Sequence, residues 1–94
     1  MFINKIADNI GSAAAGATFP VKTTGGSRVG LLQVQSSGTA TIDFEGRLDP
    51  SLPWVSLLEV PFTGGGMVSV VLPPEVRINV TAWTSGSVNA WLLE

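Results

Sequence analysis

The chain has 94 residues, of which 45% are hydrophobic and only 13% are charged, and its formal net charge is −2. A chain of this length forms one domain and buries only about 60 to 65% of the surface that its unfolded form exposes, so we expect some of its apolar surface to contact a partner. Because it lacks cysteine and histidine, disulfides, the commonest zinc ligands and histidine-based catalytic triads are excluded, and we expect no enzymatic activity, cofactor or metal. Its five basic residues are scattered, which argues against binding to nucleic acid.

The first seventeen residues differ from the rest of the chain. They lack the basic and apolar regions of a signal peptide, and no window of the chain resembles a membrane span. We therefore expect a protein that is made in the cytoplasm without export and does not enter a membrane. Residues 3–10 are compatible with about two turns of helix, and residues 11–17 are nearly all small. The sequence predicts an N-terminal arm over residues 1–17, either loose or laid over a neighbour, and a β-domain over residues 18–94.

The remaining sequence predicts short antiparallel strands, because eleven glycines and six prolines interrupt most longer stretches. Apolar and polar residues alternate in three of these strands, and the others are less regular apolar runs. In chain order, the predicted strands cover residues 19–23, 28–35, 39–48, 54–60, 67–72, 75–83 and 88–93. Six to eight strands separated by glycine and proline turns are typical of an all-β antiparallel sandwich, either jelly-roll-like or closed into a small barrel.

Two glycine-containing loops resemble three-residue hairpin turns. They are Ser36-Ser37-Gly38 and Thr84-Ser85-Gly86. We expect both to join neighbouring strands of one sheet, in a register that makes the inward-facing residues of the paired strands coincide. The side chains expected to face the core are Leu32, Val34, Ala40, Ile42, Phe44, Leu48, Val76, Ile78, Val80, Ala82, Val88, Ala90 and Leu92.

The acidic residues offer weak candidates for chemistry. Asp43 and Glu45 share a strand face about 6.5 to 7 Å apart, a separation found between glycosidase carboxylates. Arg47 lies on the same face as an expected partner, and alternate charges are typical of a surface strand, so we interpret the pair as structural. Together with Asp49 they lack the closely spaced oxygen ligands of a calcium loop. The glycine-rich segments 24–28 and 64–66 precede strands, which indicates turns instead of phosphate-binding loops.

Apolar side chains on outward strand faces are the most informative feature. Water-facing positions of an antiparallel sheet are normally polar, so several apolar ones indicate either a contact surface or a face covered by the arm or a loop. Trp54 is a candidate for the core. The candidate interface residues are Trp83, Trp91, Leu93, Val29 and Leu31, with Phe2, Ile3 and Ile6 of the arm.

Two stretches of the sequence resemble a known family. Residues 37–49, followed by residues 52–57, resemble small β-sandwich virion proteins of tailed bacteriophages, in which a strand ending in glycine and Leu-Asp or Asp-Gly leads to a tryptophan that opens the next strand. Residues 76–92 are similar to the closing hairpin of those proteins. The resemblance covers residues 37–93, although Asp49-Pro50-Ser51-Leu52-Pro53 stands where the family often has a tighter glycine turn.

The resemblance implies a structural virion protein, preferably a capsid decoration or cement protein that stabilises the phage head by binding the assembled lattice. It also implies a homo-oligomer, with a trimer favoured over a dimer, in contact with the major capsid protein or another virion protein. The alternative is a carbohydrate-binding module in a tail or receptor-contacting part, with tryptophans stacked on sugars beside polar side chains such as Asn79, Asn89 or Asp43.

Overall fold

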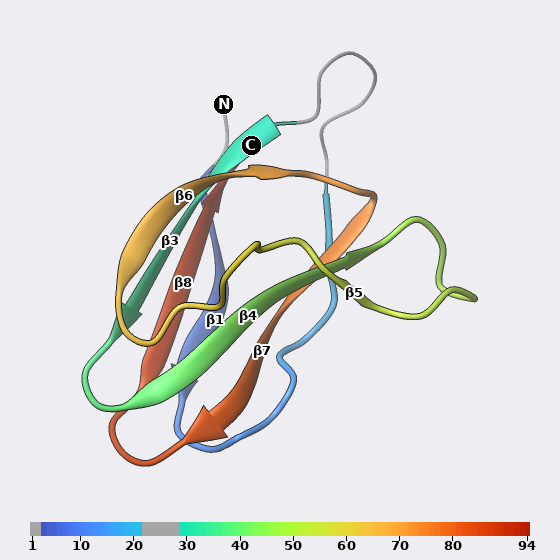
Figure 1. Ribbon diagram of the computed structural model, residues 1–94. Coiled ribbons are helices and arrows are strands. Elements are labelled where there is room, and N and C mark those ends of the chain that lie inside the picture. The colour runs from blue at the N-terminus through green and yellow to red at the C-terminus, as the bar shows by residue number, and fades with distance from the viewer. Residues whose placement is uncertain (1–2, 22–28) are drawn as a thin grey trace.

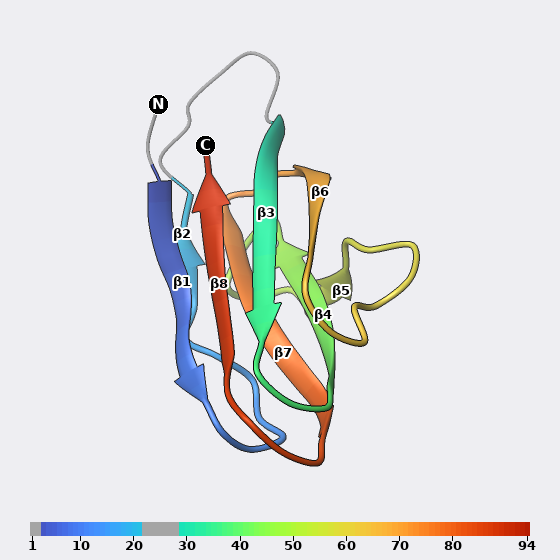
Figure 2. The ribbon, with the colours of Figure 1, turned by 90° about the vertical axis from the view of Figure 1, so that its left-hand side faces the viewer.

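The computed structural model describes residues 3–21 and 29–94, which form two four-stranded antiparallel sheets packed face to face (Figure 1). The predicted all-β sandwich is confirmed, and no helix occurs in the described residues. The strands are β1 (Ile3–Ile10), β2 (Phe19–Pro20), β3 (Val29–Ser36), β4 (Ala40–Arg47), β5 (Val55–Ser56), β6 (Gly66–Val71), β7 (Glu75–Trp83) and β8 (Val88–Leu93). Sheet A has the order β1-β8-β3-β6, seen side by side in Figure 2, and sheet B has the order β2-β7-β4-β5.

The strand pairing is that of a jelly roll. Each strand pairs with the one whose number brings the sum to nine, so that β1 pairs with β8, β2 with β7, β3 with β6, and β4 with β5. The pairs β3–β8 and β4–β7 join these ribbons into the two sheets. Eight strands in this double-sheet arrangement define the jelly-roll fold, so the structure selects it over a closed barrel.

Alternation along the strands produces the core. In β4 and β8, buried residues alternate with half-buried ones, and the buried side chains of the two sheets meet between the layers. The largest fully buried side chains are Phe44, Leu32, Ile42, Leu72, Ile78, Leu92, Val76, Val80 and Val88. The predicted inward-facing set is confirmed except at Leu48 and Ala82, which are exposed. Leu48 is exposed because it lies beyond the last residue of β4.

The two predicted hairpins are wrong, because both loops cross between the sheets. β3 of sheet A leads into β4 of sheet B, and β7 of sheet B leads into β8 of sheet A. The two corners lie side by side in Figures 1 and 2. The Ser37 amide donates to the Ser87 carbonyl at 3.0 Å, and the Thr84 amide donates to the Thr39 carbonyl at 2.8 Å. The strand pair β3–β8 of sheet A thus continues into the strand pair β4–β7 of sheet B, through two corner loops that are hydrogen-bonded to each other.

A β-bulge changes the faces at the end of β7. Ile42 lies opposite Val80, but Thr41 lies opposite Ala82, so one residue of β7 is skipped and Ala40 lies opposite Trp83. Residues directly opposite one another share a sheet face, so Trp83 lies on the face of buried Ala40. The prediction that Ala82 points inward is therefore wrong. Trp83 is exposed, at 38%, as predicted, but it lies at the end of β7 on the core side of the sheet and not on its outer face. The alternation of residue types does not reveal the bulge.

The predicted helix over residues 3–10 is also wrong. Ile3–Ile10 forms β1, which pairs with β8 and places Ile3 opposite Leu93. A register shift between Lys5 and Ala7 turns Ile6 into the core, where it is buried. Over these residues the predicted arm is an edge strand of the sandwich. The following segment runs beside β7, where the Gly16 amide donates to the Ile78 carbonyl at 2.6 Å.

Candidate functional site

The outer face of sheet A carries a continuous group of apolar side chains, which we term the outer apolar face. Its members are Ile3 of β1, Val29 and Leu31 of β3, Met67 and Val71 of β6, and Trp91 and Leu93 of β8. Ile3 and Val71 are 71% and 65% exposed, whereas Trp91 and Leu93 at the centre of the sheet are half-buried. The described part of the chain therefore leaves this face open to a partner.

Strand register brings these residues together. One row across the sheet runs Ile3, Leu93, Leu31 and Ser69, and the next runs Lys5, Trp91, Gln33 and Met67. Two shallow hollows of about 250 and 150 Å³ lie on this face, and Leu31 and Leu93 line both. At the margin, the Lys5 ammonium lies 5.4 Å from the centroid of the Trp91 ring and 2.8 Å from an Asp8 carboxylate oxygen. The face can thus receive apolar side chains near its centre.

The structure separates the predicted interface residues into groups. Five of them, Ile3, Val29, Leu31, Trp91 and Leu93, lie on the outer apolar face. Trp83 lies at the corner end of sheet B, where its indole Nε1–H donates to the Gly86 carbonyl at 3.0 Å. Ile6 is a core residue, and Phe2 lies outside the described residues.

Met67 and Val71 extend the outer apolar face but were not among the predicted interface residues. Both flank Ser69 at alternate positions of β6. The signal that points to them is this two-residue spacing, read together with the position of β6 at the sheet edge.

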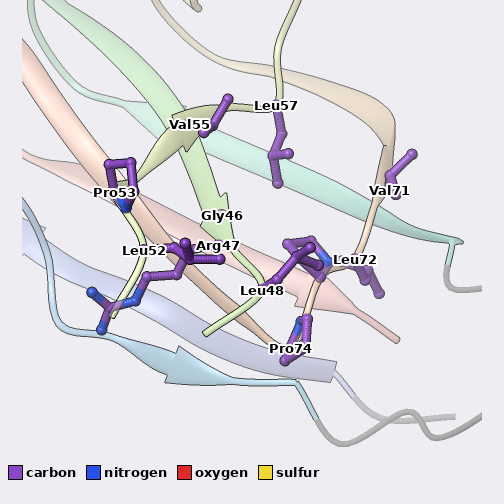
Figure 3. Close-up of a pocket in the computed structure, with 11 residues that line it drawn as sticks. Gly46, Arg47, Leu48, Leu52, Pro53, Val55, Leu57, Val71, Leu72 and Pro74 are labelled. Atoms are coloured by element: carbon purple, nitrogen blue, oxygen red, sulfur yellow. The ribbon is translucent and has the colours of Figure 1, made fainter. Parts of the chain in front are cut away.

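A second apolar surface is an open groove of about 720 Å³ at the end of β4 (Figure 3). Its side chains come from the end of β4, from the segment 48–57, from Val71 at the end of β6 and from the β6–β7 connection, so the groove meets the outer apolar face at Val71. A Cβ atom at Gly46 would lie 2.4 Å from Pro73 Cγ and 2.8 Å from Leu57 Cδ1, so glycine is needed for the close approach of these walls. The sequence did not reveal this groove, because loops distant in sequence build it.

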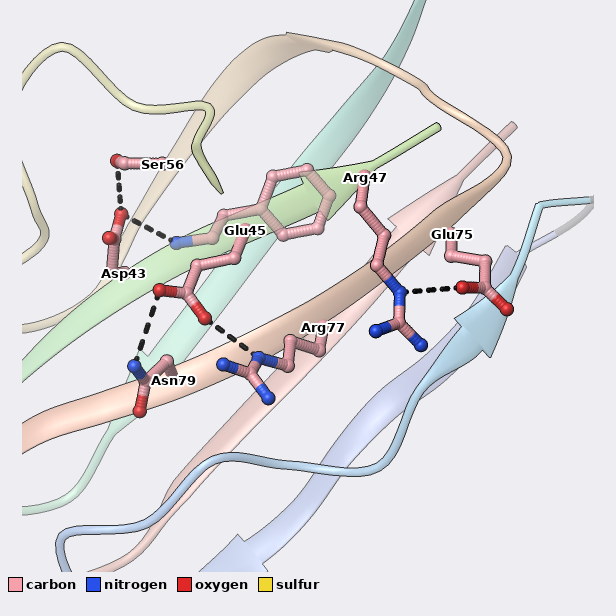
Figure 4. A network of polar contacts seen from close by, with 8 residues as sticks. Asp43, Glu45, Arg47, Ser56, Glu75, Arg77 and Asn79 are labelled. Carbon is pink, nitrogen blue, oxygen red and sulfur yellow. Dashed lines mark hydrogen bonds and ion pairs between the residues drawn. The ribbon is translucent and has the colours of Figure 1, made fainter. Parts of the chain in front are cut away.

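The outer face of sheet B is polar and ion-paired (Figure 4). Arg77 Nε donates to Glu45 Oε1 at 2.7 Å, and Arg47 Nε donates to Glu75 Oε1 at 2.7 Å. The expected pairing of Arg47 with the Asp43 and Glu45 carboxylates is therefore wrong. Asp43 instead accepts a hydrogen bond from Ser56 Oγ at 2.8 Å. These contacts neutralise or occupy the carboxylates that had suggested a hydrolytic pair.

Trp54 lies outside the core, against the arginines of this network. The guanidinium carbons of Arg47 and Arg77 lie 4.2 and 4.4 Å from the centroid of its ring. Contacts of this length between a cation and an aromatic ring are attractive. The prediction that Trp54 is a core residue is therefore wrong. Its side chain is half-buried and covers part of the polar outer face of sheet B.

Asp49 has a separate local function in the loop after β4. It accepts hydrogen bonds from the Ser51 hydroxyl and from the Ser51 amide, the latter at 3.0 Å. These bonds, that of the side chain first, lower the pKa of the Asp49 carboxyl below its ordinary value. Asp43, Glu45 and Asp49 thus bind different partners. Within residues 3–21 and 29–94, no three potential ligand side chains gather where they could hold a metal ion.

Comparison with known proteins adds no relative, since no family model, curated protein or solved structure matches the chain. In the described ranges, no helix has the length and apolar character needed to cross a membrane. The features that bear on function are therefore the jelly roll and the contrast between an apolar sheet face and a polar one.

Proposed function

We propose that the protein is a structural virion protein, a capsid decoration or cement protein that binds the assembled phage head through the outer apolar face. The observation that carries this proposal is the set of seven apolar side chains presented together on one face of sheet A. Apolar patches of this kind mark contact sites for other proteins, because exposing them to water is unfavourable. The jelly roll supports the proposal by analogy, since capsid domains are among the proteins that use it.

The strands suit this role because they hold the contact residues in place before binding. Little conformational entropy is then lost when the face is covered, and more of the apolar burial contributes to affinity. Binding to the assembled lattice, and not to its free subunits, would stabilise the lattice by mass action. Repetition over many copies would add weak contacts together. A homo-oligomer, trimeric or dimeric, would multiply this effect.

A carbohydrate-binding module is the alternative function, and it requires an accessible tryptophan face beside polar side chains. Arginine side chains already lie over the Trp54 ring, and Lys5 lies over the ring of Trp91. At these two tryptophans the contacts favour a protein partner over a sugar. Tryptophan-dependent binding to a glycan array would reverse this preference.

The decisive experiment compares two matched variants in cosedimentation with capsids that lack the protein. Val29 and Val55 are 60% and 59% exposed, but Val29 belongs to the outer apolar face and Val55 to the groove. We expect Val29→Asp to weaken capsid binding at least about tenfold, which corresponds to about 1.4 kcal/mol, and Val55→Asp to bind as the wild type does. Trp91→Ser should weaken binding as well. Unchanged binding by a folded Val29→Asp protein would refute the proposal.

A further inference from the structure

The two edges of sheet A differ in their ability to accept another strand. Strand β1, at one edge, has register shifts after Lys5 and after Ala7, and Asn9 adopts a left-handed backbone with φ 50°. It also carries the charged pair of Lys5 and Asp8. Bulges and charges of this kind prevent edge-to-edge pairing. The β1 edge is therefore protected.

Strand β6, at the opposite edge, has none of these protections. Gly66–Val71 contains no charged residue and no proline, and it pairs with β3 without a register shift. None of the backbone hydrogen bonds formed by turns and loops in the described residues involves this strand. Met67, Val68 and Val71 are all exposed. A regular, uncharged and apolar edge is a template for an added strand.

We propose that β6 pairs antiparallel with β6 of a second copy of this chain, across a two-fold axis at Ser69. Under two-fold symmetry, if one residue of the first copy lies opposite a second residue of the other copy, the second residue of the first copy also lies opposite the first residue of the other. Because directly opposite side chains share a sheet face, both partners are odd-numbered or both are even-numbered, so the axis passes through a residue that meets itself. In the middle of β6 that residue is Val68 or Ser69.

The side chains favour Ser69. With the axis at Ser69, Met67 lies opposite Val71 and Val68 lies opposite Val70, so apolar side chains meet on both faces of the sheet. With the axis at Val68, Met67 lies opposite Ser69 and Gly66 lies opposite Val70, and Val71 has no partner within the strand. The edge is thus self-complementary in the Ser69 register, which identifies a second copy as its partner.

This pairing would join the two copies of sheet A into one eight-stranded sheet. Met67 and Val71 belong to the outer apolar face, so the faces of the two copies would become continuous at the new ladder. The inference rests on the β6 edge and not on the proposed binding to a capsid. It selects the dimer from the two oligomers expected of this protein.

Cysteine cross-linking tests the axis directly, because the chain contains no cysteine. Across an antiparallel ladder, opposite Cα atoms lie about 4.5 to 5.5 Å apart, within the range that a disulfide spans. We expect Ser69→Cys to form a covalent dimer under mild oxidation. Val71→Cys is the matched control and should stay uncross-linked alone, but should cross-link when mixed with Met67→Cys. No cross-link at position 69, or equal cross-linking of both single variants, would overturn the proposal.

Charge substitution gives an independent readout in solution by analytical ultracentrifugation. The wild type should sediment as a dimer of the 9.8 kDa chain at tens of micromolar. Ser69→Lys and Ser69→Asp should each be monomeric, because like charges meet at the axis, and their mixture should restore the dimer. A wild-type monomer or trimer would contradict the proposal. Val29→Asp should remain dimeric, so failure of capsid binding and failure of edge pairing are distinguished.

Discussion

The two corners depend on single glycine residues where the backbones approach. Gly86 has φ +83°, and a Cβ atom there would lie 2.4 Å from the Gly38 amide nitrogen. We predict that Gly86→Ala lowers the free energy of unfolding by more than about 2 kcal/mol, because strain and overlap add. Gly64→Ala is the control, since no atom lies within 4 Å of its added Cβ, and its effect should stay within about 0.5 kcal/mol. Urea unfolding measures both, and equal stabilities would show that the corners tolerate a side chain.

The loop after β4 offers a prediction about pH. Hydrogen bonds from Ser51 hold the pKa of Asp49 below its ordinary value of 3.8, so the folded carboxyl binds its proton less readily than the unfolded one. The resulting stabilisation is present above the unfolded pKa and is lost as pH falls through the folded pKa. Ser51→Ala should raise the pKa of Asp49, as followed by NMR titration of its carboxyl carbon. An unchanged titration would exclude the bond from the Ser51 hydroxyl as the main cause, since the variant keeps the backbone amide bond.

At the scale of a strand, β1 can be tested as a part of the sandwich. Ile6 and Ile3 share the strand and the residue type, but Ile6 is 8% exposed and Ile3 is 71% exposed. We predict that Ile6→Ala lowers the free energy of unfolding by about 2 to 4 kcal/mol, through lost burial and a cavity. Ile3→Ala should change it by less than about 0.5 kcal/mol. If chemical denaturation shows similarly small effects for both variants, β1 does not contribute to the stability of the sandwich and residues 3–10 behave as an arm.

The sequence predicted the strands better than their connections. Alternation in three strands and apolar runs in four others identified seven strand segments. Alternation identified most of the core, because burial on one face imposes a two-residue period whatever strand lies alongside. The same pattern cannot distinguish a hairpin within one sheet from a corner between two sheets. The loops that contain Gly38 and Gly86 were therefore predicted to be hairpins, although they connect the two sheets. The apolar run 54–60 contributes only Val55–Ser56 to the ladder, because Phe62 takes the position beside Ile42. Such competition between segments is settled by tertiary packing.

The candidate surface was predictable in part. Outward positions on β3 and β8 identified four members of the outer apolar face, since strand alternation alone places Val29 beside Leu31 and Trp91 beside Leu93. That these four residues form one surface with Ile3 and Met67 could not be predicted without the strand order, which brings together residues far apart in sequence. The bulge that moves Trp83 to another face has no sequence signature here. The groove beside Gly46 likewise depends on loop packing.

The whole molecule is two-sided. Sheet A presents apolar side chains on its outer face, whereas sheet B presents half-buried ion pairs such as those of Arg77 with Glu45 and Arg47 with Glu75. Water solvates the second face well and the first poorly. The proposed contact with a capsid would therefore place sheet A toward the partner and leave the ion pairs of sheet B in water.

The pairing of Ile3 with Leu93 also determines when sheet A can be completed during synthesis of the chain. β1 leaves the ribosome first, but its partner β8 follows on the order of ten seconds later at ordinary elongation rates. Sheet A cannot close in the meantime, and slow folding is expected of a topology in which distant segments pair. The outer apolar face is therefore completed only after β8 emerges, because Trp91 and Leu93 belong to that strand. A nascent chain therefore cannot present the complete face, which only a finished molecule carries.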